Sequence, residues 1–252
     1  MIRLIHPELR DIWAYYEAGF HSLAVASVFE RFGKEGMKTA LGLLGTGQMS
    51  LTKCLVLVDA DVDARDFPSV LRAIRDHFDP SKDFLLLPGV PFDTLDFTSF
   101  TLNLGSKMVL DATKNGSAPS PAPPKIDESK ITSLHPRIRR ARCLEGALLA
   151  IQVEGEGHEV VKALVKDPAL SSVKLIAAVS PDVNLEDRES LLWGIFTRFD
   201  PARDVVFTSS ELKDAWPIYR GCLGIDATYK TGYPEPLVMN PEVIKRVNAR
   251  WQ

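Results

Sequence analysis

The sequence predicts an α/β protein with two tandem βαβ-type units, largely parallel sheets and a C-terminal helix available for docking or dimerisation. Three observations lead to this prediction. One pattern of about thirty residues occurs twice in the chain. Within each copy, short apolar runs alternate with segments of helical spacing, which is typical of crossover connections between parallel strands. A proline-rich stretch separates the copies, and an amphipathic segment follows the second.

The repeat is recognised from identities at a constant offset of 121 residues. Segments 58–87 and 179–208 share eleven of thirty residues. In the first copy the identical positions are Val58, Asp61, Val62, Asp66, Ser69, Leu71, Ile74, Phe78, Asp79, Pro80 and Asp83. An ordered series of matches indicates two copies of one unit. We therefore expect a first unit at 1–115, a Pro/Ser-rich linker at 116–142 and a second unit with a terminal helix at 143–252.

Each element of the first copy has its own signal. The apolar run 21–29 predicts a strand, and 34–44 has the apolar spacing of an amphipathic helix. Residues 54–58 form a continuous apolar run, which is typical of a strand buried on both faces. A second helix begins at the capping residue Asp66 and ends before an Asp-Pro pair. Residues 84–87 predict a third strand.

The second copy repeats this order of elements. Its predicted segments are 146–153, 158–165, 175–179, 187–199 and 205–207. After it, Asn240-Pro241-Glu242 has the composition of a helix start with proline at the first position. The following residues place an apolar stripe on one helix face, and the short unit offers it no obvious partner. We therefore expect this helix to dock on a neighbouring molecule.

Composition restricts the function classes. The 252 residues carry a formal net charge of −3, which argues against a nucleic-acid binder with a basic footprint. No window approaches the length of an apolar membrane span, and the N-terminus has no apolar core of signal-peptide length. Three cysteines far apart fit neither a zinc site nor a disulfide framework. These features predict a soluble protein in a reducing cytoplasm.

Three aspartates alternate after the strand at 54–58, as in a calcium loop. The rest of that motif fails, because Ala64 stands where glycine is required and Val70 where glutamate is required. Acidic residues between a strand and a helix N-terminus are more often caps, which is the interpretation we favour. The aspartates are Asp59, Asp61 and Asp63.

The other chemical-looking residues also favour structural roles. The glycines at 42, 45 and 47 follow a predicted helix rather than a strand, so they lack the geometry of a phosphate-binding loop. None of the histidines has metal-ligand spacing or a recognisable nucleophile as partner. The histidines are His6, His21, His77, His135 and His158.

The segment 104–113 contains the strongest candidate site. Gly105 permits close backbone approach, and Lys107 supplies a positive donor next to Ser106. One interpretation is a structural turn that leads into a strand. The other is that Lys107, with Ser106, reaches an anionic group of a cofactor or substrate. The second copy has no lysine at this place, so only the first copy would have kept such a contact.

Several strings, in order, resemble the C-terminal domain of the UbiD-type carboxy-lyases, which decarboxylate aromatic and unsaturated acids with prenylated flavin. They include FHSL at 20–23, DADVD at 59–63 and GSKM with DAT at 105–113. In the second copy, the WGI of 193–195 and the TRFDPARD of 197–204 match the family most closely. The resemblance is to larger members with a duplicated tail, among them menaquinone-route enzymes.

The resemblance also implies what this chain lacks. In the family, the flavin, the metal and the essential Arg and two Glu lie mainly in an upstream split-barrel domain, for which we find no counterpart. We therefore expect no catalytic residue, no metal ligand and no cofactor in this chain alone, and no activity alone. The complete enzyme is expected to hold prenylated FMN and a metal ion. The chain is expected to dimerise or oligomerise that enzyme and to close over its active site.

Two further interpretations stay open. One is a stand-alone interaction module that serves no enzyme. The other is an independent nucleotide-binding α/β enzyme, although no phosphate loop follows a predicted strand. The absence of any flavin domain encoded with or near the chain would favour the interaction module. A rise in melting temperature on addition of a nucleotide would favour the nucleotide-binding enzyme.

Overall fold

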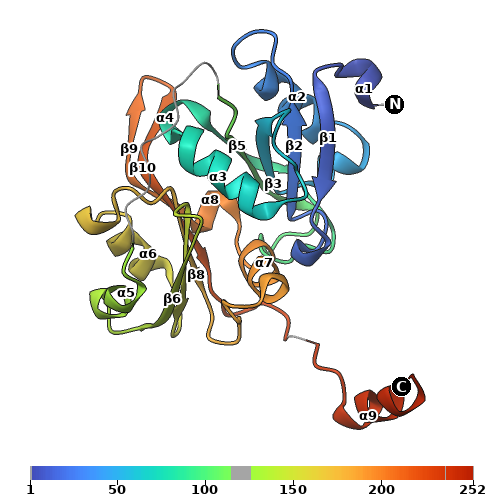
Figure 1. Cartoon of the computed structure of the whole chain (residues 1–252), viewed down its shortest axis with the longest axis vertical. Helices are drawn as coiled ribbons and strands as arrows, with labels where there is room; N and C mark the ends of the chain where they lie inside the picture. Colours follow the sequence, from blue (N-terminus) through green and yellow to red (C-terminus); the bar gives the residue numbers. More distant parts are fainter. Residues whose placement is uncertain (1, 115–125, 236, 252) are drawn as a thin grey trace.

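A computed structural model describes residues 2–114, 126–235 and 237–251. The described chain contains two five-stranded sheets of the same topology, with orders β1-β2-β3-β5-β4 and β6-β7-β8-β10-β9 (Figure 1). This confirms the prediction of two similar α/β units. We call residues 2–114 unit 1 and residues 126–251 unit 2.

The elements of unit 1 are α1 (Ile2–Ile5), β1 (Leu9–Ala14), η1 (Tyr16–Ala18), β2 (Leu23–Val28), α2 (Glu35–Leu44), η2 (Gly47–Leu51), β3 (Cys54–Asp59), α3 (Phe67–His77), α4 (Pro80–Asp83), β4 (Phe84–Pro91) and β5 (Leu104–Asp111). The elements of unit 2 are α5 (Glu128–Leu134), β6 (Ile138–Leu144), β7 (Leu148–Val153), α6 (His158–Leu164), η3 (Pro168–Leu170), β8 (Leu175–Val179), α7 (Arg188–Phe196), α8 (Pro201–Asp204), β9 (Val205–Lys213), β10 (Trp216–Ala227) and α9 (Pro241–Arg250).

The central strands of each sheet are parallel and the edges are antiparallel. In unit 1, β2, β3 and β5 run parallel, while β1 and β4 pair antiparallel with their neighbours. Unit 2 repeats this arrangement with β7, β8 and β10 at the centre. Strands β2 and β7 have no exposed residue because helices cover both faces of the sheet, as their continuous apolar runs predict.

Aspartates begin the helices that follow β3 and β8, as predicted for Asp66. The Asp66 carboxylate accepts a hydrogen bond from the backbone amide of Ser69 at 3.2 Å and caps α3. Asp187 caps α7 in the same way through Ser190. Part of the expected linker is outside the described residues. The remainder contains α5 and the start of β6, which pairs with β7 at the edge of the second sheet.

The two units share one hydrophobic core. Helices α3 and α7 pack between the inner faces of the two sheets, and their buried side chains belong to one continuous cluster with those of β2, β3, β5, β7, β8 and β10. The outer faces are covered separately, by α2 in unit 1 and by α5 and α6 in unit 2. Because the central layer comes from both units, each unit completes the core of the other.

Ion pairs across the contact surface between the units, which we call the seam, follow a pseudo-twofold pattern. Arg72 of α3 binds Glu145 in the β6–β7 turn of unit 2 at 2.9 Å. Reciprocally, Arg188 of α7 binds Glu17 in η1, between β1 and β2 of unit 1, also at 2.9 Å. The seam therefore resembles the self-complementary contact of a symmetric dimer.

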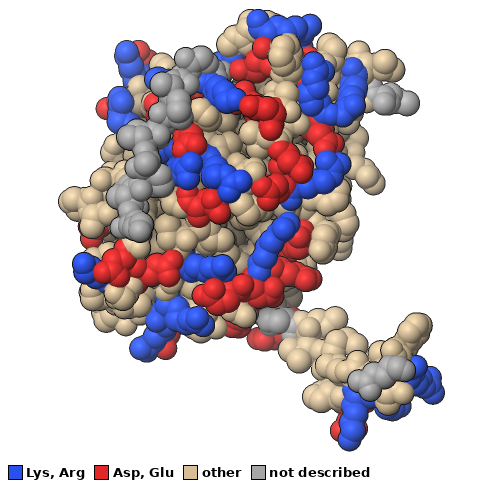
Figure 2. All heavy atoms as spheres, viewed as in Figure 1, with Lys and Arg blue, Asp and Glu red and all other residues tan. Residues whose placement is uncertain are grey.

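Helix α9 lies apart from the body, joined to it by the segment after β10 (Figure 1). Its capping residue is Asn240, as predicted, and none of its residues is buried. The apolar side chains of Ile244, Val247 and Trp251 are exposed. Positive and negative side chains are interspersed over the viewed face of the molecule (Figure 2).

Among the residues that the structure describes, no helix has both the length and the apolar character needed to cross a membrane.

Candidate functional site

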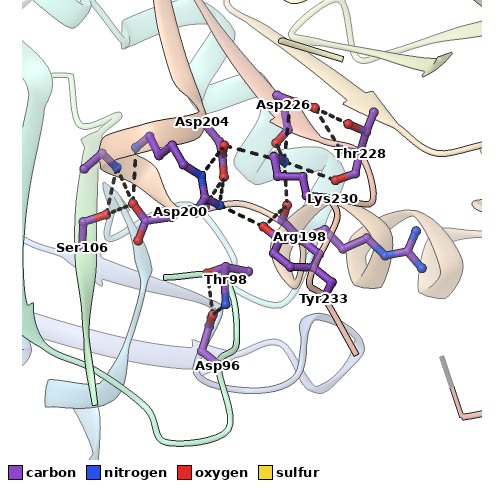
Figure 3. Close-up of polar contacts among 12 residues, drawn as sticks. Asp96, Thr98, Ser106, Arg198, Asp200, Asp204, Asp226, Thr228, Lys230 and Tyr233 are labelled. Atoms are coloured by element: carbon purple, nitrogen blue, oxygen red, sulfur yellow. Dashed lines mark hydrogen bonds and ion pairs between the residues drawn. The ribbon is translucent and has the colours of Figure 1, made fainter. Parts of the chain in front are cut away.

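Polar groups, most of them buried, gather along one side of the seam, which we call the seam site (Figure 3). It lies where the β4–β5 loop, residues 92–103, meets α8 and the end of β10. Its residues are Lys53, Asp96, Thr98, Ser106, Arg198, Asp200, Arg203, Asp204, Asp226, Thr228, Lys230 and Tyr233.

Ser106 joins the two units. Its hydroxyl donates to Oδ1 of Asp200 at 2.8 Å and accepts a hydrogen bond from the amide of Ala202 at 2.8 Å. Asp200 is the capping residue of α8, so this contact fixes the start of α8 against β5. Both Ser106 and Asp200 are buried. Ser106 is therefore a structural contact at the seam in this arrangement.

Lys107 points to the opposite face of β5, because side chains alternate along a strand. It is 3% exposed, and its ammonium donates to the backbone carbonyl of Ser50 at the end of η2. Burial lowers the pKa of Lys107 below its usual range. The structure therefore does not bring Lys107 together with Ser106, and each side chain already has a protein partner.

A buried ion pair that the sequence did not predict joins Lys53, just before β3, to Asp96 in the 92–103 loop. The Lys53 ammonium is 2.7 Å from Oδ2 of Asp96, and the two side chains are 1% and 8% exposed. It also lies 5.1 Å from the centre of the Phe199 ring of unit 2. The available signal was the lysine that precedes the central strand in both copies, Lys53 and Lys174. Its carboxylate partner comes from a distant loop and has no such signal.

A charged network continues from α8 into the end of unit 2. Arg203 forms two hydrogen bonds with Asp204, at 3.0 and 2.7 Å, and one with the hydroxyl of Tyr233 at 3.0 Å. Although burial opposes it, hydrogen bonding to Asp204 raises the pKa of Arg203. The Lys230 ammonium donates to the carbonyl of Asp226 at 2.8 Å, and burial lowers its pKa. Charges of both signs in this network therefore compensate one another.

An open pocket of about 560 Å³ adjoins this network. Phe100 of the 92–103 loop forms one wall, and the guanidinium of Arg203 lies 4.9 Å from the centre of its ring. The remaining wall carries charges of both signs, from Arg137, Glu159 and Lys230 among others. The pocket therefore offers polar contacts, but its lining contains no nucleophile held by a general base.

The three alternating aspartates have protein partners. Asp59 accepts a hydrogen bond from the amide of Lys114 at 2.9 Å, and Asp61 pairs with the ammonium of Lys114 at 2.7 Å. Asp63 accepts from the amide of Arg65 at 2.9 Å. Within the described ranges, no group of three or more His, Cys, Asp or Glu side chains is placed to hold a metal ion.

The glycine-rich segment and the histidines also have structural surroundings. Gly42 lies in the last turn of α2, Gly45 is its C-terminal cap and Gly47 begins η2, so the segment connects a helix to a strand as expected. Nδ1 of His21 lies 2.5 Å from Oδ2 of Asp93 and ties the 92–103 loop to the start of β2. Nδ1 of His6 lies 3.2 Å from Oε1 of Glu8.

Comparison with known proteins gives a consistent result. The family model for the 3-octaprenyl-4-hydroxybenzoate carboxy-lyase C-terminal domain matches residues 1–112 and 138–227, and so covers both units. A Chlamydia pneumoniae protein that is named as a subunit of 4-hydroxybenzoate decarboxylase is 33% identical over 252 residues. That match covers 98% of this chain and 41% of the relative. The chain thus spans about two fifths of the length of the curated relatives that it matches along its whole length.

Solved structures of decarboxylases match part of this chain in a structural comparison. The Sedimentibacter hydroxybenzoicus vanillic acid decarboxylase in its open form is 26% identical with a TM-score of 0.43, over 50% of this chain and 26% of that one. An evolved dimeric form of the UbiD-class enzyme HmfF from Pelotomaculum thermopropionicum is 18% identical with a TM-score of 0.37, over 68% and 45%. The family match across both units confirms the resemblance found in the sequence: this chain belongs to the UbiD-type family, as its 3-octaprenyl-4-hydroxybenzoate carboxy-lyase C-terminal domain.

Proposed function

We propose that this chain is the C-terminal, oligomerising and active-site-closing part of a cytoplasmic UbiD-like decarboxylase. Its substrates would be aromatic or unsaturated acids, with quinone biosynthesis as the setting. The observation that carries the proposal is the family match across both units, together with a relative named as a decarboxylase subunit. The catalytic split-barrel flavin domain belongs to the same polypeptide or to a separate subunit.

The complete enzyme is proposed to use prenylated FMN and a metal ion, which supply the decarboxylation chemistry. The residues described here do not fit a metal site, because no cluster of ligating side chains is present among them. The two candidate cofactor contacts are Lys107, which is bound to a backbone carbonyl, and Ser106, which is bound to Asp200. The tasks proposed for this chain are therefore to cover the active site and to assemble the enzyme.

An exposed apolar surface is formed by the 92–103 loop and α7. One hollow of about 110 Å³ is lined by Leu95, Phe97 and Trp193, which are 86%, 36% and 52% exposed. Exposed apolar groups gathered from two units mark interaction sites more often than scattered ones do. We propose that this surface packs against the flavin domain.

The exposed stripe of α9 supports self-association. Its apolar side chains cover nothing in the described part of this chain, although its stripe has the spacing of a packed helix. We propose that α9 docks on a second copy of the protein, so that the assembled enzyme is an oligomer.

The central experiment mixes the purified chain with the candidate flavin domain and measures carbon dioxide release from aromatic acids. We expect activity from the mixture, and none from this chain alone. Stoichiometric flavin absorbance or carbon dioxide release by this chain alone would contradict the proposed division of labour.

Trp193→Ser provides a sharper test of the docking surface. The variant should fold normally, because the side chain is half exposed, and should bind the flavin domain about ten-fold or more weakly, as for an aromatic interface anchor. Trp251→Ser, at the C-terminal cap of α9, is the matched control and should leave this affinity unchanged. Equal loss in both variants would argue against the assigned surface.

A further inference from the structure

The seam has two pseudo-equivalent sides. On the first side, Lys53 precedes β3, and the next residue pairs with Met108 of β5. On the second side, Lys174 precedes β8, and the next residue pairs with Leu223 of β10. Each lysine then reaches across the seam toward the same repeated phenylalanine, Lys53 to the ring of Phe199 and Lys174 to the carbonyl of Phe78 at 3.0 Å. The two lysines are therefore structural equivalents.

Only the first side contains the loop that satisfies its lysine. The 92–103 loop inserts Asp96 beside Lys53. In unit 2 the corresponding connection is the short turn at residues 214–215 between β9 and β10. Among the described residues, no carboxylate lies within ion-pair distance of Lys174. The residue equivalent to Ser106 is Gly221, so the second side also lacks the hydroxyl that fills the first.

A pocket occupies the place that the missing loop leaves. It has a volume of about 610 Å³ and is lined by residues of both units, including Lys174, Gly221 and Ser171 from unit 2. Lys34 and Lys82 of unit 1 also line it. The pocket is thus a space at the seam with three ammonium groups in its wall.

The acidic groups in the same wall already have partners. Asp76 binds the guanidinium of Arg75 at 2.7 Å. Asp79 accepts from the amide of Ser81 at 3.0 Å, and Asp83 pairs with the ammonium of Lys34. Although burial opposes it, hydrogen bonding to Ser81 and the charges of Lys82, at 3.6 Å, and Lys174 lower the pKa of Asp79. The partly buried Lys174 makes no ion pair of its own in the described chain and donates to the neutral Phe78 carbonyl.

We propose that this pocket binds a small carboxylic acid in its ionised form, with Lys174 as the counter-ion. The ligand carboxylate would take the position on Lys174 that Asp96 takes on Lys53. The Lys174 ammonium already donates a charge-assisted hydrogen bond to the Phe78 carbonyl, and a ligand carboxylate would add an opposite charge beside it. The site is separate from the seam site and requires no flavin domain, so its test does not depend on the proposed function.

The test titrates the full chain with benzoate, succinate and inorganic phosphate at constant ionic strength, by calorimetry. We expect saturable binding of at least one carboxylate, weakened about ten-fold or more in Lys174→Gln, since a hydrogen bond to a charged group is worth that much. The glutamine amide retains a donor for the Phe78 carbonyl. Lys130 is an exposed lysine outside the pocket, so Lys130→Gln should bind the carboxylate as tightly as the wild type does.

A second variant tests the equivalence of the two sides. Asp96→Ala removes the carboxylate from Lys53, so added acetate should raise the melting temperature of this variant more than that of the wild type. This readout tests the equivalence of the two lysines, and carboxylate binding by the wild type tests the pocket itself if Lys174→Gln does not fold. The proposal is overturned if neither carboxylate binds saturably, if Lys174→Gln binds equally well, if phosphate binds more tightly than both acids, or if acetate gives Asp96→Ala no extra stabilisation.

Discussion

The buried pair of Lys53 and Asp96 predicts a large loss of stability when the carboxylate is removed. In Asp96→Ala the ammonium keeps its surroundings, in which its side chain is 1% exposed, but loses its counter-charge. Removing one partner of a buried pair costs about 3–5 kcal/mol. The remaining contact with the Phe199 ring at 5.1 Å places the expectation at the lower end, about 3 kcal/mol.

The assay is equilibrium unfolding in urea, followed by tryptophan fluorescence, with the midpoint and slope fitted separately. Asp61→Ala is the matched control, because it removes a carboxylate from an ion pair with Lys114 whose side chains are 67% and 49% exposed. Such exposed pairs are worth about 0–1 kcal/mol. Asp96→Asn, which keeps an acceptor oxygen, should fall between the two. If Asp96→Ala costs no more than Asp61→Ala, the reasoning from burial is refuted.

Three further predictions concern other parts of the molecule. Although burial opposes it, hydrogen bonding lowers the pKa of Glu8 to about 2. The stabilisation by the ionised Glu8 is therefore present above pH 4.5 and is lost as the pH falls toward 2. In Glu8→Gln, the urea midpoint of unfolding should change less with pH between 4.5 and 2 than it does in the wild type. A Cβ at Gly194 would lie 2.4 Å from Cγ2 of Val183, so Gly194→Ala should lower the free energy of unfolding by about 1–3 kcal/mol in the same assay. A Cβ at Gly33 would have no atom within contact distance, so Gly33→Ala should lower it by less than about 1 kcal/mol. Deleting residues 240–252 should leave the unfolding midpoint unchanged but lower the mass found by light scattering; an unchanged mass would contradict docking on a second copy.

The repeat made much of the fold predictable. Apolar runs identified the central strands β2, β3, β7 and β8 and also the edge strands β4 and β9, and the cap at Asp66 marked the helix that follows β3. Pairing was harder to predict: the runs at 84–87 and 205–207 form antiparallel edges, and the central place of β5 and β10 is not specified locally. β1, for example, carries the adjacent charged residues Arg10 and Asp11 near its start and is held by pairing with β2. The shared core was also not predicted, because an apolar helix face does not say which sheet will cover it.

The candidate site shows the same limit. That Ser106 and Lys107 point to opposite faces follows from strand periodicity alone, once β5 is assigned. The ion pair between Lys53 and Asp96 depends instead on how a twelve-residue loop crosses the seam, which no local pattern encodes. Contacts between distant segments, such as Lys53 with Asp96 and Ser106 with Asp200, form only when the two units pack together along the seam.

The interleaved core has a consequence for synthesis of the protein on the ribosome. Helix α3 is complete well before α7 and the strands of unit 2, which share its core, have been translated. At about 5–20 residues per second, the growing chain carries the uncovered apolar face of α3 for on the order of 10 s. During that interval the nascent first half is a natural client for a chaperone, and slowing translation between the two repeats should increase its aggregation.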